Sequence, residues 1–132
     1  MNPEILTRLV WTFGIVLLGV ALYKLTNRAV LNRAAAQTPV TENGTPSILY
    51  FTSPDCSPCK TVQRPAIDRV ANLLGETLEV IEINAYEQPD LAKTWGVMSV
   101  PTTFVLDARG EARFVNNGVA RAEKLMEQIQ TL

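Results

Sequence analysis

This 132-residue chain contains an uncharged, apolar run near its amino terminus, which limits the folds that the chain can adopt. The run extends from Leu9 to Tyr23 (LVWTFGIVLLGVALY), and with its flanking apolar residues it covers residues 5–25. At a rise of about 1.5 Å per residue, such a helix spans roughly 30 Å, which is the thickness of a bilayer's hydrocarbon core. Trp11 and Tyr23 lie near its two ends, where amphipathic aromatic side chains favour the membrane interface. We therefore expect residues 1–33 to form a transmembrane anchor with a basic flank.

Two other interpretations of this run remain open. One is a buried core helix, although a domain this small can hardly enclose a helix that is apolar on every face. The other is a cleavable signal peptide, because the alanines at 34–36 resemble a small-residue cleavage site. However, Lys24, Arg28 and Arg33 separate the run from those alanines, and a cleavage region is normally neither basic nor so distant. A retained anchor is the interpretation that these residues favour.

The same charges predict how the anchor is oriented. The amino-terminal side carries Arg8, Glu4 and the terminal amine, whereas three cations flank the other side. The positive-inside rule then places the carboxy-terminal part of a single-pass protein on the cytoplasmic side of the plasma (inner) membrane. The difference in charge is small, so an extracytoplasmic domain remains the alternative.

The rest of the chain divides into a linker and a folded domain. Residues 34–46 lose the apolar pattern and gather Thr, Pro, Asn and Gly, which is typical of a flexible linker. Residues 47–132 have the pattern of one globular domain. The net charge of the whole chain is −1, so it lacks the basic surface of a nucleic-acid-binding protein.

The globular part alternates between strand and helix patterns. Strands are predicted at 48–52, 78–83, 102–106 and 111–115, and helices at 59–74, 89–95 and 122–132. The predicted apolar faces of the first and last helices are Val62, Ile67, Val70, Leu73 and Leu74, and Leu125, Met126 and Ile129. The order βαβαββα indicates an α/β fold with a central mixed sheet and flanking helices, in which the first strand pair is parallel and the edge is antiparallel.

A C-x-x-C motif, Cys56-Ser57-Pro58-Cys59, joins the first predicted strand to the first long helix. A helix amino terminus presents unpaired N–H groups and a partial positive charge, which stabilise a thiolate there. Cys56 is therefore the predicted nucleophile and is expected to be exposed. Cys59, one turn further in, would be more buried and would resolve a mixed disulfide with substrate. Pro58 suits a first helical turn because its missing N–H costs nothing there.

The absence of histidine and the presence of only two cysteines exclude several other kinds of catalytic and metal site. Without histidine the chain has no Ser-His-Asp or Cys-His catalysis and no histidine-built zinc site. Two cysteines form neither a four-thiolate metal site nor a disulfide framework. We therefore expect no metal and no cofactor other than the redox-active disulfide itself. A metal held between two chains is the alternative use of the dithiol.

With these residues in place, residues 46–132 resemble a thioredoxin-fold domain. The family pattern is a strand, a C-x-x-C helix, a strand, a short helix and then a cis-proline before the next strand. The stretch GVMSVPT at 96–102 matches the family's segment around that proline. The resemblance implies that the Val100–Pro101 bond is cis and faces Cys56, and that the Val100 backbone offers hydrogen bonds to an extended substrate peptide.

The resemblance also implies the rest of the substrate surface. Gly118 resembles the glycine that follows the family's hairpin and keeps the floor of the site open, although an ordinary turn glycine explains it equally well. The implied substrate-binding residues are Ser57, Pro58, Val100, Pro101 and Gly118.

Several positions depart from the family pattern. Asp55 replaces the usual tryptophan before the first cysteine, and its charge opposes thiolate formation. Tyr50 stands where thioredoxins carry a buried acid that moves the proton of the resolving thiol. Glu82 replaces the lysine that accompanies that acid. Glu82 either takes over the proton shuttle or lies on the exposed face of its strand, and the residue alternation favours exposure. The helix proline, Pro65, falls one residue late.

Together these features predict a membrane-tethered thiol–disulfide oxidoreductase that reduces protein disulfides. Strong oxidants of this fold resemble one another in carrying histidine between the cysteines, and this chain carries Ser57-Pro58. Its reduction potential is therefore expected nearer to the roughly −270 mV of thioredoxin than to the roughly −120 mV of a strong oxidant. The implied partners are a disulfide-containing protein, an external thiol reductant of the thioredoxin-reductase type, and the lipid bilayer. A membrane-bound scaffold module with incidental cysteines, or an inter-chain metal carrier, is the alternative.

Overall fold

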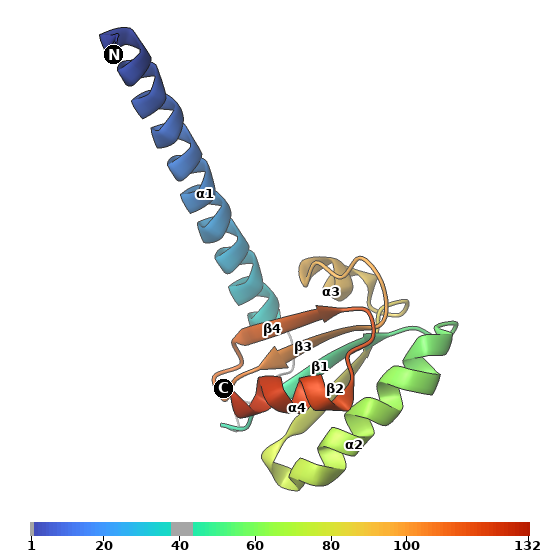
Figure 1. Cartoon of the computed structure of the whole chain (residues 1–132). Coiled ribbons are helices and arrows are strands. Elements are labelled where there is room, and N and C mark those ends of the chain that lie inside the picture. The colour runs from blue at the N-terminus through green and yellow to red at the C-terminus, as the bar shows by residue number, and fades with distance from the viewer. Residues whose placement is uncertain (1, 38–43) are drawn as a thin grey trace.

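The computed structural model describes residues 2–37 and 44–132 (Figure 1). The elements in chain order are α1 (Pro3–Gln37), β1 (Ser47–Thr52), the π-helical turn η1 (Cys59–Gln63), α2 (Arg64–Leu74), the 3-10 turn η2 (Gly75–Thr77), β2 (Glu79–Asn84), α3 (Pro89–Thr94), β3 (Thr102–Leu106), β4 (Ala112–Asn117) and α4 (Ala122–Gln130). Every predicted strand and helix is present, with small shifts at the ends. The predicted βαβαββα order is confirmed.

The four strands form one mixed sheet in the order β2-β1-β3-β4. β1 pairs with β2 in parallel, so that Tyr50 lies opposite Glu82, and it pairs with β3 antiparallel. β3 and β4 form the antiparallel edge hairpin, and β4 continues two residues beyond the predicted end, to Asn117. All six residues of β1 are buried, as expected of an apolar strand that is covered on both faces.

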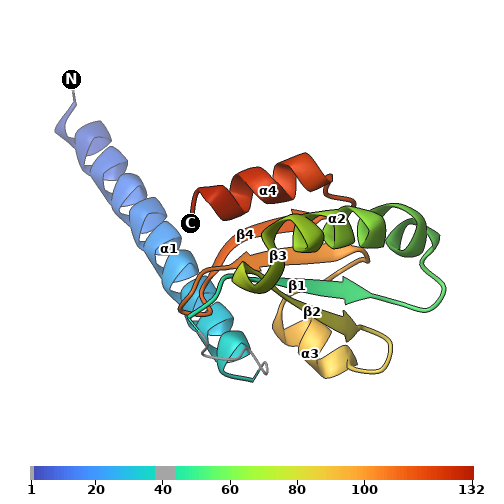
Figure 2. The same ribbon diagram turned by 90° about the horizontal axis from the view of Figure 1, so that it is seen from below.

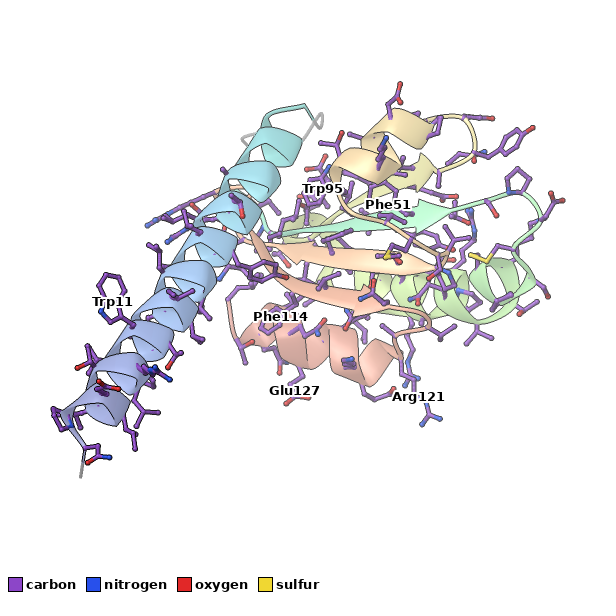
Figure 3. The ribbon with its side chains drawn as sticks, turned by 90° about the horizontal axis from the view of Figure 1, so that it is seen from above. Trp11, Phe51, Trp95, Phe114, Arg121 and Glu127 are labelled. Carbon is purple, nitrogen blue, oxygen red and sulfur yellow. A yellow bond between two sulfur atoms is a disulfide. The ribbon has the colours of Figure 1, made fainter. Side chains whose placement is uncertain are left out.

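Helices cover both faces of this sheet. Figure 2 shows α2 and α4 on one face and α3 on the other. The alternating side chains of β1 divide between two cores, with Ile48 and Tyr50 facing α2 and α4, and Leu49 and Phe51 facing α3. On the α3 side the rings of Phe51 and Trp95 (labelled in Figure 3) pack with that of Phe104, and the Trp95 and Phe104 centroids are 4.8 Å apart.

The helix after the C-x-x-C motif differs from the prediction in its first turns. It opens with a π-helical turn, in which the N–H of Arg64 bonds to the carbonyl of Cys59 five residues earlier. This wider turn shifts the inward face, which consists of the buried Gln63, Ile67 and Val70 and the partly buried Leu74. The predicted inward positions of Val62 and Leu73 are therefore wrong, since these side chains are 47% and 68% exposed.

The amino-terminal helix α1 extends away from the domain (Figure 1). Its segment Pro3–Thr26 has a mean hydropathy of 2.1, and none of it is buried in the structure. The helix is long and apolar enough to cross a membrane, and its exposure contradicts the core-helix interpretation. A retained anchor and a signal sequence both remain compatible with it. The helix continues past residue 33 into the segment that we expected to be a linker, and residues 38–43 of that segment lie outside the described residues.

Candidate active site at the Cys56–Cys59 disulfide

Cys56 and Cys59 are joined by a disulfide at the carboxyl end of β1, and their Cα atoms are 5.3 Å apart. The chain leaves β1 through a short turn, in which the N–H of Cys56 donates to the carbonyl of Ser53 at 3.3 Å. Helical structure begins at Ser57, so Cys56 occupies the position that caps the helix. The motif therefore lies at a helix amino terminus, as the sequence predicted.

The two sulfur atoms have unequal environments. The backbone N–H of Cys59 donates to Cys56 Sγ at 3.2 Å, so one of the free N–H groups of the helix end points at this sulfur. Cys56 is 8% exposed and Cys59 is fully buried. The prediction of an exposed Cys56 was wrong in extent, because the surrounding core covers most of it. The predicted order of exposure, with Cys56 more exposed than Cys59, is confirmed, since of the two cysteines only Cys56 is accessible to another molecule. Ser57 and Pro58 in the first helical turn are exposed beside it.

The cis-proline loop completes one side of the site. The Val100–Pro101 bond is cis, as the resemblance implied. Val100 is half-buried and packs against the cluster that contains both cysteines, whereas Pro101 is buried. The carbonyl of Pro101 accepts the N–H of Gly118 at 2.9 Å. Gly118 has a φ of +88°, which is the reason for glycine here, while an added Cβ would meet no atom within 4 Å.

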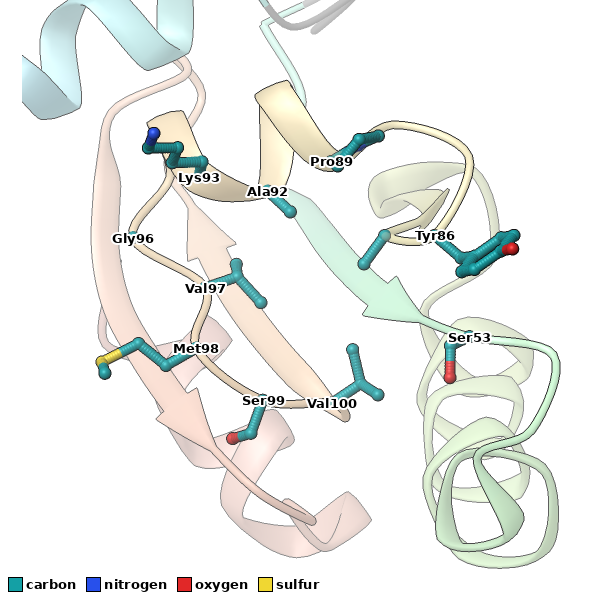
Figure 4. Close-up of a pocket in the computed structure, with 11 residues that line it drawn as sticks. Ser53, Tyr86, Pro89, Ala92, Lys93, Gly96, Val97, Met98, Ser99 and Val100 are labelled. Carbon is teal, nitrogen blue, oxygen red and sulfur yellow. The ribbon is translucent and has the colours of Figure 1, made fainter.

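A hollow of about 530 Å³ adjoins this loop (Figure 4). Its walls are mainly apolar and include Ala92, Val97 and Val100. Ser53 and Val100 both line it, and Figure 4 shows them at the same end. The backbone carbonyl of Ser53 accepts the N–H of Cys56, so one lining residue of the hollow is hydrogen-bonded to the C-x-x-C turn. Apolar hollows with a few polar groups are typical binding sites.

Tyr50 lies beneath Cys59. Its side chain is 2% exposed, and its hydroxyl donates to the carbonyl of Cys59 at 3.1 Å. Burial, assisted by the nearby negative charge of Glu82, raises the pKa of Tyr50 above its ordinary value of 10.0. Tyr50 is therefore a neutral hydrogen-bond donor at physiological pH, in the place where thioredoxins carry an acid.

Glu82 shares the sheet face of Tyr50 but is tied to a different element. Its carboxylate forms an ion pair with the guanidinium of Arg64 at the start of α2, and the Glu82 side chain is 39% exposed. The exposure favoured by the residue alternation is therefore confirmed. A proton-shuttle role for Glu82 stays a prediction.

One buried residue near the disulfide, Gln63, was not predicted from the sequence. Gln63 is fully buried, and its side-chain amide bonds to the backbone of Ala120. The signal was present, because a polar residue four positions after Cys59 shares its helix face with the apolar Ile67 and Val70. Within residues 2–37 and 44–132, no group of three metal-ligating side chains gathers at one place.

A mixed sheet with a disulfide at the start of a helix and a cis-proline beside it is the arrangement of the thioredoxin fold. The family model for thioredoxin matches residues 27–131. The thioredoxin of Methanocaldococcus jannaschii is 36% identical over 83 residues, which cover 63% of this chain and 91% of that protein. The thioredoxin of Bacillus subtilis is 33% identical over 79 residues, or 60% of this chain and 74% of that one. This chain belongs to the thioredoxin family.

Solved structures agree with this assignment of the fold. Chloroplastic thioredoxin z superposes with a TM-score of 0.63 at 22% identity, covering 70% of this chain and 81% of that one. A mutant thioredoxin from Halobacterium salinarum gives a TM-score of 0.62 at 25% identity, covering 70% and 78%. The family and the C-x-x-C pair together make this chain a thiol–disulfide oxidoreductase.

The Tyr50→Phe substitution removes the hydrogen bond to Cys59. We expect it to lower the free energy of unfolding by about 1 kcal/mol at neutral pH, measured by urea denaturation of the full chain in detergent. Because the pKa of Tyr50 is raised on folding, its contribution to stability is present below pH 10 and is lost as the pH rises through the folded-state pKa. The difference in free energy of unfolding between the wild type and the variant should therefore become smaller above pH 10.

Tyr86→Phe is the matched control, because Tyr86 is 81% exposed. It should change stability by less than about 0.5 kcal/mol at any pH tested. A Tyr50→Phe protein as stable as wild type at neutral pH, or a difference that stays constant into alkaline pH, would contradict the assigned role.

Proposed function

We propose that this protein is a membrane-tethered reductase of protein disulfides. The observation that carries the proposal is the position of the Cys56–Cys59 disulfide, which lies at a helix amino terminus beside the cis-proline loop with only Cys56 accessible. Membrane tethering, the reducing direction and the choice of partners go beyond the family assignment and form part of the proposal.

The reaction consists of two thiol–disulfide exchanges. In the reduced protein the Cys56 thiolate attacks one sulfur of a substrate disulfide, breaks that bond and releases a substrate thiolate, which takes up a proton from water. The Cys59 thiolate then attacks Cys56 Sγ in the mixed disulfide and releases the second substrate thiol. Two electrons pass to the substrate, and the protein is left with the Cys56–Cys59 disulfide that the structure contains. An external thiol reductant returns it to the dithiol.

The site's electrostatics support the reducing direction. The Cys59 N–H and the helix end favour a thiolate at Cys56, but the exposed Asp55 carboxylate next to it acts against that charge. The two residues between the cysteines add no positive charge. A thiolate that is less stabilised makes the dithiol a better electron donor, because the reduced state is then the less favoured one.

A substrate peptide has a continuous surface to follow from the disulfide. Val100 precedes the cis bond and borders both the cysteine cluster and the hollow. We assign its backbone to hydrogen bonds with an extended peptide, and Ser57, Pro58, Pro101 and Gly118 to the rim around Cys56. In this arrangement, an apolar side chain near the substrate cysteine enters the hollow.

Membrane attachment follows from α1. Its span Pro3–Thr26 is an apolar helix that is fully exposed in the structure. Exposure of such a surface to water is unfavourable, whereas a bilayer can bury it. The cations after the span favour a cytoplasmic domain, where the thiol reductants of the cell also operate. The proposed partners are therefore a cytoplasmic disulfide-bearing protein, a thioredoxin-reductase type of donor, and the bilayer.

The Cys59→Ser variant tests the exchange mechanism. It retains the attacking sulfur but cannot release the mixed disulfide, so it should accumulate a covalent adduct with a disulfide-bearing protein on non-reducing gels. The Cys56→Ser variant should form none, because Cys59 is fully buried. The double variant contains no thiol at all and reports the background. Adducts formed through Cys59 in place of Cys56 would overturn the assignment of the nucleophile.

Thiol labelling in intact cells tests the topology. After reduction by a permeant thiol, a membrane-impermeant maleimide should label Cys56 only once the cells are permeabilised, and carbonate extraction should leave the protein in the membrane pellet. The Cys56→Ser variant is the control for labelling elsewhere. Labelling of intact cells would place the domain outside, and recovery in the soluble fraction would show that the apolar segment has been removed.

A further inference from the structure

Gln63 makes an unusual long-range contact behind the disulfide. Its side chain is fully buried, its Nε2 donates to the carbonyl of Ala120 at 3.1 Å, and its Oε1 accepts the N–H of Ala120 at 2.7 Å. The two residues are 57 positions apart in the sequence. One side-chain amide thus satisfies both backbone groups of Ala120, as a neighbouring strand would.

Ala120 needs such a partner because of where it lies. It is 1% exposed, and it falls between the end of β4 at Asn117 and the start of α4 at Ala122. Buried backbone groups outside regular structure are costly unless they are hydrogen-bonded elsewhere. The side chain of Gln63 supplies these bonds from the helix that carries the cysteines.

The segment 118–120 is therefore held at both ends. Gly118 donates to the carbonyl of the cis-proline, Pro101, and Ala120 is held by Gln63. Gln63 in turn follows Cys59 by four residues on the buried side of η1. The disulfide turn, the cis-proline loop and segment 118–120 are thus joined into one frame by hydrogen bonds.

We propose that Gln63 is a positioning residue that fixes segment 118–120 against the dithiol helix and thereby sets the affinity for protein substrates. This inference rests on the proposed disulfide reductase function. Ala120 belongs to the buried cluster that contains both cysteines, and Val100 packs against that cluster. An extended peptide that binds along Val100 therefore passes beside segment 118–120. When the hydrogen bonds from Gln63 are lost, the rim loses its fixed shape, while the two sulfur atoms keep their positions.

The same geometry separates binding from chemistry. The amide of Gln63 bonds to Ala120, and it is fully buried, so it touches no substrate. The N–H of Cys59 donates to Cys56 Sγ, and a substitution of Gln63 leaves this hydrogen bond in place. A small disulfide that needs no rim should therefore react with the variant as it does with the wild type.

The test compares Gln63→Met with Gln128→Met in the full chain. Gln128 also forms two amide hydrogen bonds, with Asn116 at 3.0 and 2.9 Å, but these join β4 to α4 and leave segment 118–120 untouched. Each protein is assayed for reduction of insulin and of dithiobis(nitrobenzoate), a small aromatic disulfide. Amide hydrogen exchange at Ala120 is measured in parallel.

For Gln63→Met we expect the KM for insulin to rise about tenfold, the change that corresponds to about 1.4 kcal/mol of binding free energy. The rate with the small disulfide should stay within about twofold, and exchange at Ala120 should accelerate by about tenfold or more. Gln128→Met should leave all three unchanged. An equal loss on both disulfides, an equal effect of Gln128→Met, or no effect on the KM would each overturn the proposal.

Two measurements on the wild type test the proposal independently of the variants. If Gln63→Met fails to fold, exchange in the wild type still tests the contact, since an Ala120 amide as fast to exchange as that of the exposed Val119 would contradict it. If wild type reduces neither disulfide, the proposed function fails, while protected exchange at Ala120 would show that the frame itself exists.

Discussion

Every residue of β1 is buried, with β2 and β3 on its two sides and helices over both of its faces. This burial holds the carboxyl end of β1, from which the C-x-x-C turn leaves the sheet, on both sides and both faces. Only a few residues separate Thr52 from the start of the helix, so Cys56 lies at the helix amino terminus. The chemistry of the dithiol depends on this position.

The environment of the disulfide combines opposing influences. The N–H of Cys59 points at Cys56 Sγ and favours negative charge there, whereas Asp55 brings a carboxylate close to it. Beneath the site, a neutral tyrosine replaces the buried acid of thioredoxins and holds the carbonyl of Cys59. Glu82, which lies opposite this tyrosine on β2, is paired with Arg64. The result is a site with the geometry of its family and a different set of polar groups around Cys59.

Much of this was predictable from the sequence because its signals are local. The β-rich run before Cys56, the helical spacing after it and the C-x-x-C spacing identified the disulfide and its place in the fold. The cis bond before Pro101 was available only through the resemblance to the thioredoxin fold, since spacing alone does not distinguish cis from trans. The extent to which Cys56 is covered depends on packing from several elements, so the sequence overstated its exposure.

What the sequence did not predict involves either a change of helical period or a distant partner. The π-helical turn rotates the helix face, so that Gln63 lies inward and Val62 outward. The bonds from Gln63 to Ala120 join residues 57 positions apart, and no local pattern reports them. The amide of Gln63 and the N–H of Gly118 together join three segments that are separate in the sequence: the C-x-x-C helix, the cis-proline loop and residues 118–120.

If Cys56 and Cys59 form a reducing couple, the equilibrium reduction potential of that couple must be low. The full-length protein is equilibrated with glutathione buffers of known ratio, and the fractions of dithiol and disulfide are measured by alkylation. A potential near the roughly −270 mV of thioredoxin is the predicted result. A value above about −180 mV, in the range of disulfide-forming catalysts, would contradict it.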